Sequence, residues 1–186
     1  SAAFDLASVW AAAPPEDAVV ADGPIGVRNL IALNTFFMVR EIESSLALAK
    51  NVNVDKINRT VTWLLPSSKT DPGAAGSTRQ WGCVCKNKEK GDRSPCPFHA
   101  ARAQLELLED KFNGRVTCLP LFPTSDGEVT DKARIVDTLE EVNSRLGVDI
   151  VDDWGSRRFG GHSFRVTGAQ HMAALGLEMY RIQLMA

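Results

Sequence analysis

A histidine and an arginine lie three residues apart near the end of the chain, in the stretch Gly160–Ala169 (GGHSFRVTGA). The stretch is typical of a helix start. Because residues at i and i+3 share one helix face, we expect the His162 imidazole and the Arg165 guanidinium to point into one site. A guanidinium binds phosphate through parallel hydrogen bonds, and an imidazole exchanges a proton near neutral pH. The pair suits phosphoryl transfer, although a helix start with one solvated arginine and one hydrogen-bonded histidine has the same pattern.

Two other cations can belong to such a site. Arg40 is predicted in the middle of an apolar helix, with Glu43 three residues later, and a cation so near a core is costly unless it is paired. Glu43 can hold Arg40 toward a phosphate, or the two can form an ordinary surface pair. Lys69 lies in a turn between two predicted strands. There it is either solvated or able to protonate a leaving oxygen.

A separate group of residues has the chemistry of a metal site. Cys83-x-Cys85 is followed by ten residues and then by Cys96-x-x-His99, which together offer three thiolates and one imidazole. Four such ligands can close a tetrahedral zinc site with no open position for water, so this zinc would be structural. The first spacing is tighter than the usual two to four intervening residues. Reduced thiols on a loop are the alternative.

The apolar pattern predicts a mixed, mostly helical α+β fold with a small antiparallel sheet. We expect one long helix over residues 29–50, strands within 51–65 and 77–85, and a helix over 98–112. Thr130 is a candidate N-cap for a helix ending at Leu146, with Gly147 after it. Residues 1–27 are interpreted as an entry segment that contains a short amphipathic helix over 4–13.

Composition limits the classes of protein that the chain can be. The 186 residues are 44% hydrophobic and 24% charged, which is typical of a globular domain, and no apolar run reaches the roughly 20 residues of a membrane helix. The net charge of −2 argues mildly against a nucleic-acid binder. The distribution of charge nevertheless favours a nucleic-acid binder. Residues 69–102 carry seven basic and three acidic residues, whereas residues 103–156 carry five basic and twelve acidic residues. Residues 157–186 form a second basic block, with four arginines and one acidic residue. Either a polyanion meets the two basic blocks, or these charges simply lie on solvated faces.

The order of these motifs resembles the catalytic domain of tyrosine recombinases, also called phage-type integrases. The stretches that carry the resemblance are FFMVREIE at residues 36–43 and GGHSFRVTGA at 160–169, with Lys69 between them. The resemblance covers residues 28–186 and is nearest to recombinase-like proteins of eukaryotic mobile elements. It implies a DNA breaking and rejoining (integrase-like) core, with residues 83–99 as a Cys/His insertion, in an intracellular protein that is nuclear in a eukaryotic cell.

What the resemblance implies for function is DNA recombination and integration through a phosphotyrosyl intermediate, with no metal in the chemistry. Arg40 and Arg165 would hold the scissile phosphate, Lys69 would be the general acid, His162 would assist proton transfer, and Glu43 would support Arg40. The partners would be duplex DNA and further copies of the protein on that DNA, and no membrane. The basic residues expected to contact DNA are Arg79, Lys86, Lys88, Lys90, Arg157 and Arg158.

The chain departs from the family pattern at the nucleophile. Its one tyrosine, Tyr180, comes too soon after the His162 helix, and its apolar neighbours predict a core position. The nucleophile is therefore expected beyond Ala186, so that this chain would bind DNA without cleaving it. Two alternatives stay open, which are an inactive DNA-binding relic of the fold and a zinc-stabilised interaction module in which His-x-x-Arg is accidental.

Overall fold

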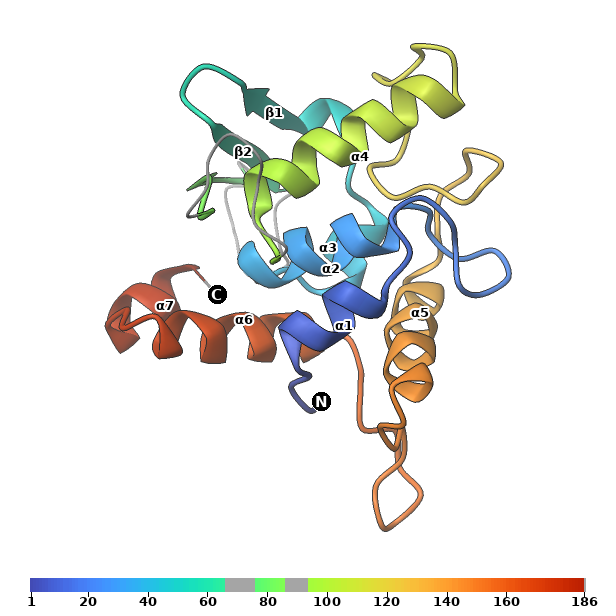
Figure 1. Cartoon of the computed structure of the whole chain (residues 1–186), viewed down its shortest axis with the longest axis vertical. Helices are drawn as coiled ribbons and strands as arrows, with labels where there is room; N and C mark the ends of the chain where they lie inside the picture. The colour runs from blue at the N-terminus through green and yellow to red at the C-terminus, as the bar shows by residue number, and fades with distance from the viewer. Residues whose placement is uncertain (66–75, 86–93, 186) are drawn as a thin grey trace.

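The computed structural model describes residues 1–65, 76–85 and 94–185, and within them the chain is α+β and mostly helical, as predicted. A small antiparallel sheet lies against a group of helices centred on α2 (Figure 1). The helices are α1 (Leu6–Ala12), α2 (Val27–Phe36), α3 (Glu41–Ser45), α4 (Pro97–Lys111), α5 (Lys132–Arg145), α6 (Ser163–Ala174) and α7 (Met179–Met185), with a 3₁₀ turn η1 (Ala49–Asn51). The strands are β1 (Val52–Asp55), β2 (Thr60–Leu65) and β3 (Ser77–Gly82).

The sheet has the strand order β1-β2-β3, and its central strand packs on the core. Val61, Trp63 and Leu65 alternate along β2 and are all buried, which is the period-two pattern of a half-buried strand. The Trp63 ring meets the Phe37 ring edge to face, with 5.2 Å between centroids. Hydrophobic burial on this one face therefore fixes which side of the sheet looks toward α2.

Helix α2 is the centre of the core and contacts α1, α4 and α6. The prediction of one helix over residues 29–50 is wrong, because α2 ends at Phe36 and Met38 adopts a positive φ of 49°. A new helix, α3, then begins after Arg40. The Glu43 carboxylate accepts the Arg40 backbone N–H at 2.6 Å, and this is one half of a capping box. Local capping therefore divides a continuous apolar pattern into two helices.

Two other sequence predictions also need correction. The N-cap of α5 is Asp131, whose carboxylate accepts the Ala133 N–H at 2.7 Å, whereas the buried Thr130 hydroxyl donates to the Phe122 carbonyl. Tyr180 is not a core residue, because 54% of it is exposed, and the residue that α7 buries is Ile182. Spacing alone did not show which face of so short a helix meets the core.

Helix α6 crosses α2 with almost no space between the two backbones. A Cβ atom built on Gly168 would overlap the Thr35 carbonyl oxygen and lie 2.6 Å from Met38 Cγ. Phe164, one turn earlier, is fully buried in the same core. The crossing sets the height of α6 above the end of α2, and it therefore positions Arg165.

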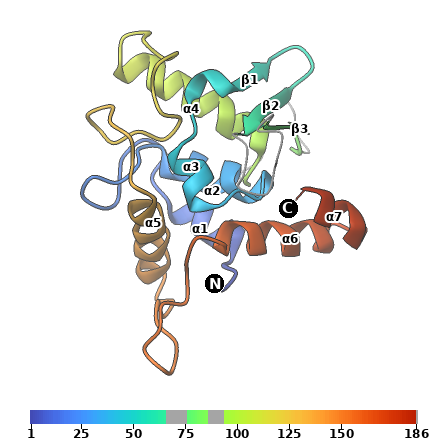
Figure 2. The same cartoon turned by 180° about the vertical axis from the view of Figure 1, so that it is seen from behind.

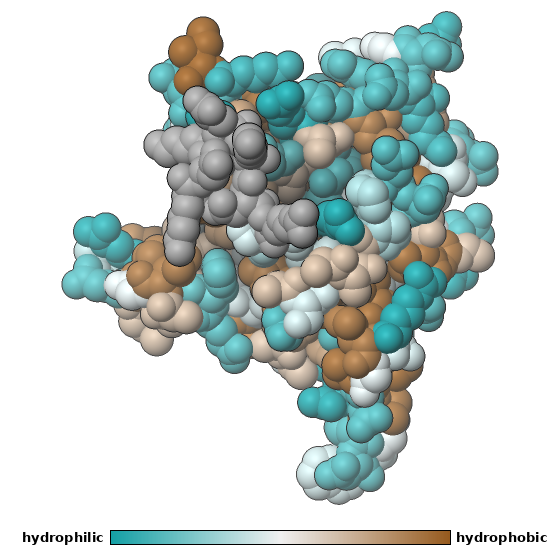
Figure 3. Space-filling view, in the orientation of Figure 1, coloured by the Kyte–Doolittle hydropathy of each residue, from teal (hydrophilic) through white to brown (hydrophobic). Residues whose placement is uncertain are grey.

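The outline of the molecule is uneven. The loop between α5 and α6 projects away from the rest of the chain in both views (Figures 1 and 2). It carries Trp154, which is 87% exposed, and the Asp152 carboxylate holds the loop by accepting the Trp154 and Ser156 N–H groups. Hydrophilic residues cover most of α4 on the face shown in Figure 3. No helix among the described residues is both long and apolar enough to cross a membrane.

Replacing Gly168 by alanine should force α6 away from α2, because the added methyl group meets a backbone carbonyl that cannot rotate aside. We expect the free energy of unfolding to fall by about 2–3 kcal/mol, as for other overpacked cores. Urea unfolding followed by circular dichroism measures the change. Gly82→Ala is the matched control, because a Cβ there meets no atom within 4 Å. Equal stability of the two variants would contradict the close crossing.

Candidate functional site

One carboxylate joins two arginines that are far apart in the sequence. The Glu43 Oε1 atom lies 3.1 Å from Arg40 Nη2, and Glu43 Oε2 lies 3.4 Å from Arg165 Nη2. Glu43 is largely buried, with 12% of its side chain exposed, against 31% for Arg40 and 24% for Arg165. The start of α3 and the first turn of α6 therefore meet at a single charged group.

Phe37 and Met38, the two residues directly after α2, hold Arg79 and Arg165 through their carbonyls. Arg165 Nε donates to the Met38 carbonyl at 2.9 Å, and Arg79 Nη1 from β3 donates to the Phe37 carbonyl. The last carbonyls of a helix have no partner within the helix and carry partial negative charge, so they accept cations well. A third guanidinium is in this way brought close enough to interact electrostatically with Arg165 and Glu43. We name Arg40, Arg79, Arg165 and Glu43 the arginine cluster.

Sequence reasoning grouped Arg79 with general DNA contacts and missed its place in this cluster. The signal that could have found it is the strand period. Arg79 and Trp81 are two residues apart on β3 and share a face. The Trp81 ring packs edge to face on Phe36 at a centroid distance of 5.6 Å. The strand face that contacts the end of α2 therefore carries Arg79 as well.

The electrostatics of the cluster favour an anion. Burial lowers the pKa of the Arg165 guanidinium, Glu43 opposes this, and the neighbouring Arg40 lowers it further. Burial also lowers the pKa of Arg79, with the same opposition from Glu43 and a further lowering by Arg165. The Glu41 carboxylate also acts on Arg165 and raises its pKa. Arginine stays protonated in proteins, so three positive charges lie near two carboxylates, Glu43 and Glu41. The unbalanced positive charge is what a phosphate group would neutralise.

His162 lies beside this cluster at the start of α6. It is the N-cap residue of the helix and is exposed, whereas Arg165 is half-buried. The preceding Gly161 contacts α3 directly, because its carbonyl accepts the Glu41 N–H at 3.4 Å and a Cβ on it would overlap the Glu41 carboxylate. His162 is therefore an exposed residue next to the junction between α3 and α6.

The other predicted DNA contacts differ in their surroundings. Arg157 is bound by two carboxylates of α5, at 2.9 Å from Glu140 and 2.6 Å from Asp137, and these hydrogen bonds raise its pKa. Its charge is therefore already balanced. Arg158 is exposed and donates to the Asp149 carbonyl at 3.3 Å. The remaining predicted site residues lie outside the described part of the chain, and they are Lys69, Lys86, Lys88 and Lys90.

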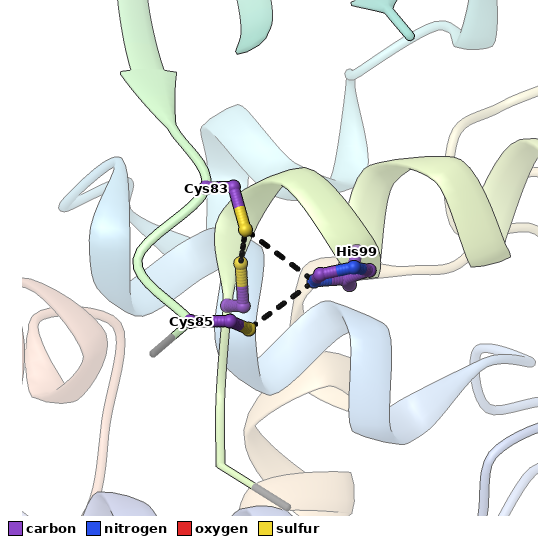
Figure 4. Close-up of side chains that lie close together, drawn as sticks. Cys83, Cys85 and His99 are labelled. Carbon is purple, nitrogen blue, oxygen red and sulfur yellow. Dashed lines mark hydrogen bonds between the residues drawn. The ribbon is translucent and has the colours of Figure 1, made fainter. Parts of the chain in front are cut away.

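The second candidate site is the cysteine and histidine group. The thiols of Cys83, Cys85 and Cys96 and a ring nitrogen of His99 all lie within 4.8 Å of one another and can hold a metal ion. Cys83 and Cys85 follow β3, Cys96 is the N-cap of α4, and His99 is in the first turn of that helix. Figure 4 shows the side chains of Cys83, Cys85 and His99 pointing toward each other from the two segments. We name them the Cys₃His cluster.

The distances within the Cys₃His cluster are those of hydrogen-bonded thiols and imidazole. His99 Nδ1 lies 3.3 Å from Cys85 Sγ and 3.9 Å from Cys83 Sγ, and the Cys83 and Cys96 sulfurs are 3.9 Å apart. Burial acts to raise the pKa of the Cys83 thiol, but hydrogen bonds from the Cys85 backbone and from Arg59 outweigh it, so this pKa is lowered. A lowered thiol pKa favours the thiolate, which is the form that binds metals.

Neither a protein-family model nor a curated protein sequence matches this chain. The functional assignments below therefore depend on the side-chain geometry of the arginine cluster and the Cys₃His cluster.

Replacing Glu43 by glutamine should loosen the junction between α3 and α6, because two half-buried guanidiniums lose their shared charge partner. We expect a loss of about 1–2 kcal/mol in the free energy of unfolding, less than for a fully buried pair because solvent screens both arginines in part. Urea unfolding measures it. Glu106→Gln breaks an exposed pair with Arg102 on α4 and should cost less than about 0.5 kcal/mol. An equal effect of both variants would show that Glu43 does not join the helices.

Proposed function

We propose that this chain binds duplex DNA and that the arginine cluster receives one phosphate of the DNA backbone. The observation that carries the proposal is the pairing of Arg40 and Arg165 with one carboxylate, Glu43. Arg79, held on the Phe37 carbonyl, is close enough to interact electrostatically with Glu43 and Arg165. Three guanidiniums face two carboxylates, Glu43 and Glu41, and this leaves a local excess of one positive charge in a half-buried position. A phosphodiester is a single anion with two free oxygens, which suits two guanidinium forks.

The same geometry suits strand cleavage of the tyrosine recombinase type, which is our wider proposal for the full-length protein. Arg40 and Arg165 would each bind a non-bridging oxygen and stabilise the charge that develops on the pentacoordinate phosphorus. Glu43 holds both guanidiniums before substrate arrives, so little reorganisation is needed. His162, an exposed residue at the start of α6, would orient the phosphate and assist proton transfer. Lys69 remains the proposed general acid for the leaving oxygen.

The nucleophile separates DNA binding from DNA cleavage. Tyr180 is the one tyrosine of the chain, and its hydroxyl accepts a hydrogen bond from Arg181 Nε at 3.1 Å on its own helix. Among the described residues no hydrogen bond joins Tyr180 to the arginine cluster, so we do not assign it the role of nucleophile. An inactive DNA-binding relic of the same fold makes every contact proposed here except the covalent one. A covalent adduct between the full-length protein and nicked DNA would distinguish the two.

We also propose that the metal of the Cys₃His cluster is zinc. Three thiolates and one imidazole are the donor set that zinc takes in four-coordinate structural sites. A bound zinc would join the segment after β3 to the first turn of α4, and no ligand position would be left for water. Its role would therefore be structural, and the basic segment between Cys85 and Cys96 would be tied at both ends.

Removing a charge from the arginine cluster should weaken DNA binding and lower its dependence on salt. For Arg165→Gln and Arg79→Gln we expect a loss of about 1–3 kcal/mol in binding free energy and a drop of about 1 in the slope of log K against log salt. Fluorescence anisotropy with a labelled duplex at several salt concentrations measures both quantities.

Arg134→Gln is the control, because Arg134 lies on α5, where it forms an exposed pair with Asp137 and not with a residue of the cluster. The control variant should bind DNA with the affinity of the unmodified protein. If the unmodified protein shows no salt-dependent binding, both DNA proposals fail and the zinc-stabilised interaction module is left.

Protein purified without chelators should carry one zinc ion per chain, as measured by metal analysis. Cys96→Ser should lose that zinc, and the segment after β3 should become accessible to protease, because α4 loses its link to the sheet. Cys118→Ser is the matched control, since Cys118 is exposed and lies outside the Cys₃His cluster. Protein that is free of zinc at neutral pH would refute the proposed metal.

A further inference from the structure

Arg59 contacts the Cys₃His cluster although it is not one of its four ligand residues. It ends the turn between β1 and β2 with a positive φ of 54°, and its carbonyl accepts the Cys83 N–H at 2.8 Å. Its Nη2 atom lies 3.6 Å from Cys83 Sγ and 3.3 Å from His99 Nε2. The guanidinium also lies over the Phe98 ring, 5.2 Å from its centroid. Backbone and side chain together fix Arg59 against the cluster.

With zinc bound, the centre would be negatively charged, and the Arg59 guanidinium would balance that charge. Zinc contributes two positive charges and three thiolates contribute three negative ones, so the centre with a neutral imidazole has a net charge of −1. Cys85 and Cys96 are buried, with 5% and 3% exposed, and together with Phe98 they form a small hydrophobic cluster. A negative charge in such surroundings is costly unless a cation pairs with it.

The position of the proton on the His99 ring decides whether Arg59 can donate to His99 or to the Cys83 sulfur. Without a metal, His99 Nδ1 can donate to the Cys85 sulfur and Nε2 can accept from Arg59. When Nδ1 binds a metal, the proton of the neutral ring is on Nε2, which can no longer accept from a guanidinium. The Arg59 Nη2 donor then has the Cys83 sulfur as its partner.

We propose that Arg59 is the charge-balancing residue of the zinc centre and that it shields the Cys83 thiolate from electrophiles. This inference depends on the zinc proposed above. Arg59 acts on the ligands and not on the ion, so it is a positioning residue. The hydrogen bond and the nearby positive charge of Arg59 draw electron density from the Cys83 sulfur. This makes its electron pair less available to an alkylating reagent such as iodoacetamide. In that reaction the sulfur forms a bond to the reagent's CH₂ carbon and iodide leaves.

The first test measures zinc affinity by competition with a chelator. We expect Arg59→Gln to bind zinc about 10- to 100-fold more weakly, which is the usual effect of removing a partner of a metal ligand. Arg59→Lys keeps the charge and should recover a part of that loss. Arg102→Gln is the matched control, because it removes one charge from the exposed side of α4 and should leave the affinity unchanged.

The second test measures thiol reactivity in the zinc-loaded protein, with iodoacetamide and peptide mass spectrometry. Cys83 should be alkylated faster in Arg59→Gln than in the unmodified protein, and the exposed Cys118 should react at the same rate in both. A role in packing alone would not change the rate at Cys83 in a protein whose circular dichroism is unchanged. This readout therefore separates charge balance from packing.

The possible results decide between the two proposals. Unmodified protein that holds no zinc refutes the zinc centre and this inference with it. Zinc binding that is equally tight in Arg59→Gln and in the unmodified protein overturns the role of Arg59 and leaves the zinc centre intact. An equal loss of affinity in Arg59→Lys and Arg59→Gln, with no change in the alkylation of Cys83, also overturns it.

Discussion

The ion pair between Glu43 and Arg165 is the interaction on which the arginine cluster depends. It joins α3 to α6 across 122 positions of sequence, and its carboxylate also caps α3 through the Arg40 N–H. The same carboxylate therefore has two roles. It caps the start of a short helix, and it positions a guanidinium that is distant in the sequence. Because only 12% of the Glu43 side chain is exposed, water screens the attraction between Glu43 and Arg165 less than it screens a surface ion pair.

Packing brings the pair together before charge can act. Gly168 lets α6 approach the Thr35 carbonyl, and the end of α2 then presents free carbonyls to Arg165 and Arg79. Arg165 would not reach Glu43 if the two helices were a side chain farther apart. The positive potential proposed to hold a phosphate is thus a product of helix packing, because close-packed backbones leave no room for the guanidiniums to turn elsewhere.

The Cys₃His cluster performs a similar task at the other side of the sheet. It connects the segment after β3 to the first turn of α4, and Arg59 ties it to the turn between β1 and β2. Sheet and helix are otherwise held there by few buried side chains, mainly Phe98 and its neighbours. A metal ion at this point would supply the stability that a small hydrophobic cluster cannot. The two sites therefore fix opposite ends of β3, Arg79 near its start and Cys83 just after its end.

The sequence by itself determined the elements with strong local signals. These are the α+β class, the buried alternation of Val61, Trp63 and Leu65, the start of α6 after His162, and the metal-ligand spacing of the cysteines, all of which depend on neighbours in the chain. Only the tertiary structure decided that the pattern over residues 29–50 is broken after Phe36 and that Tyr180 faces solvent. It alone brought Arg79 to the arginine cluster and Arg59 to the cysteines. The physical reason is that periodicity reports which side of an element is apolar, whereas contacts between distant charges depend on how closely and at what angle the elements pack.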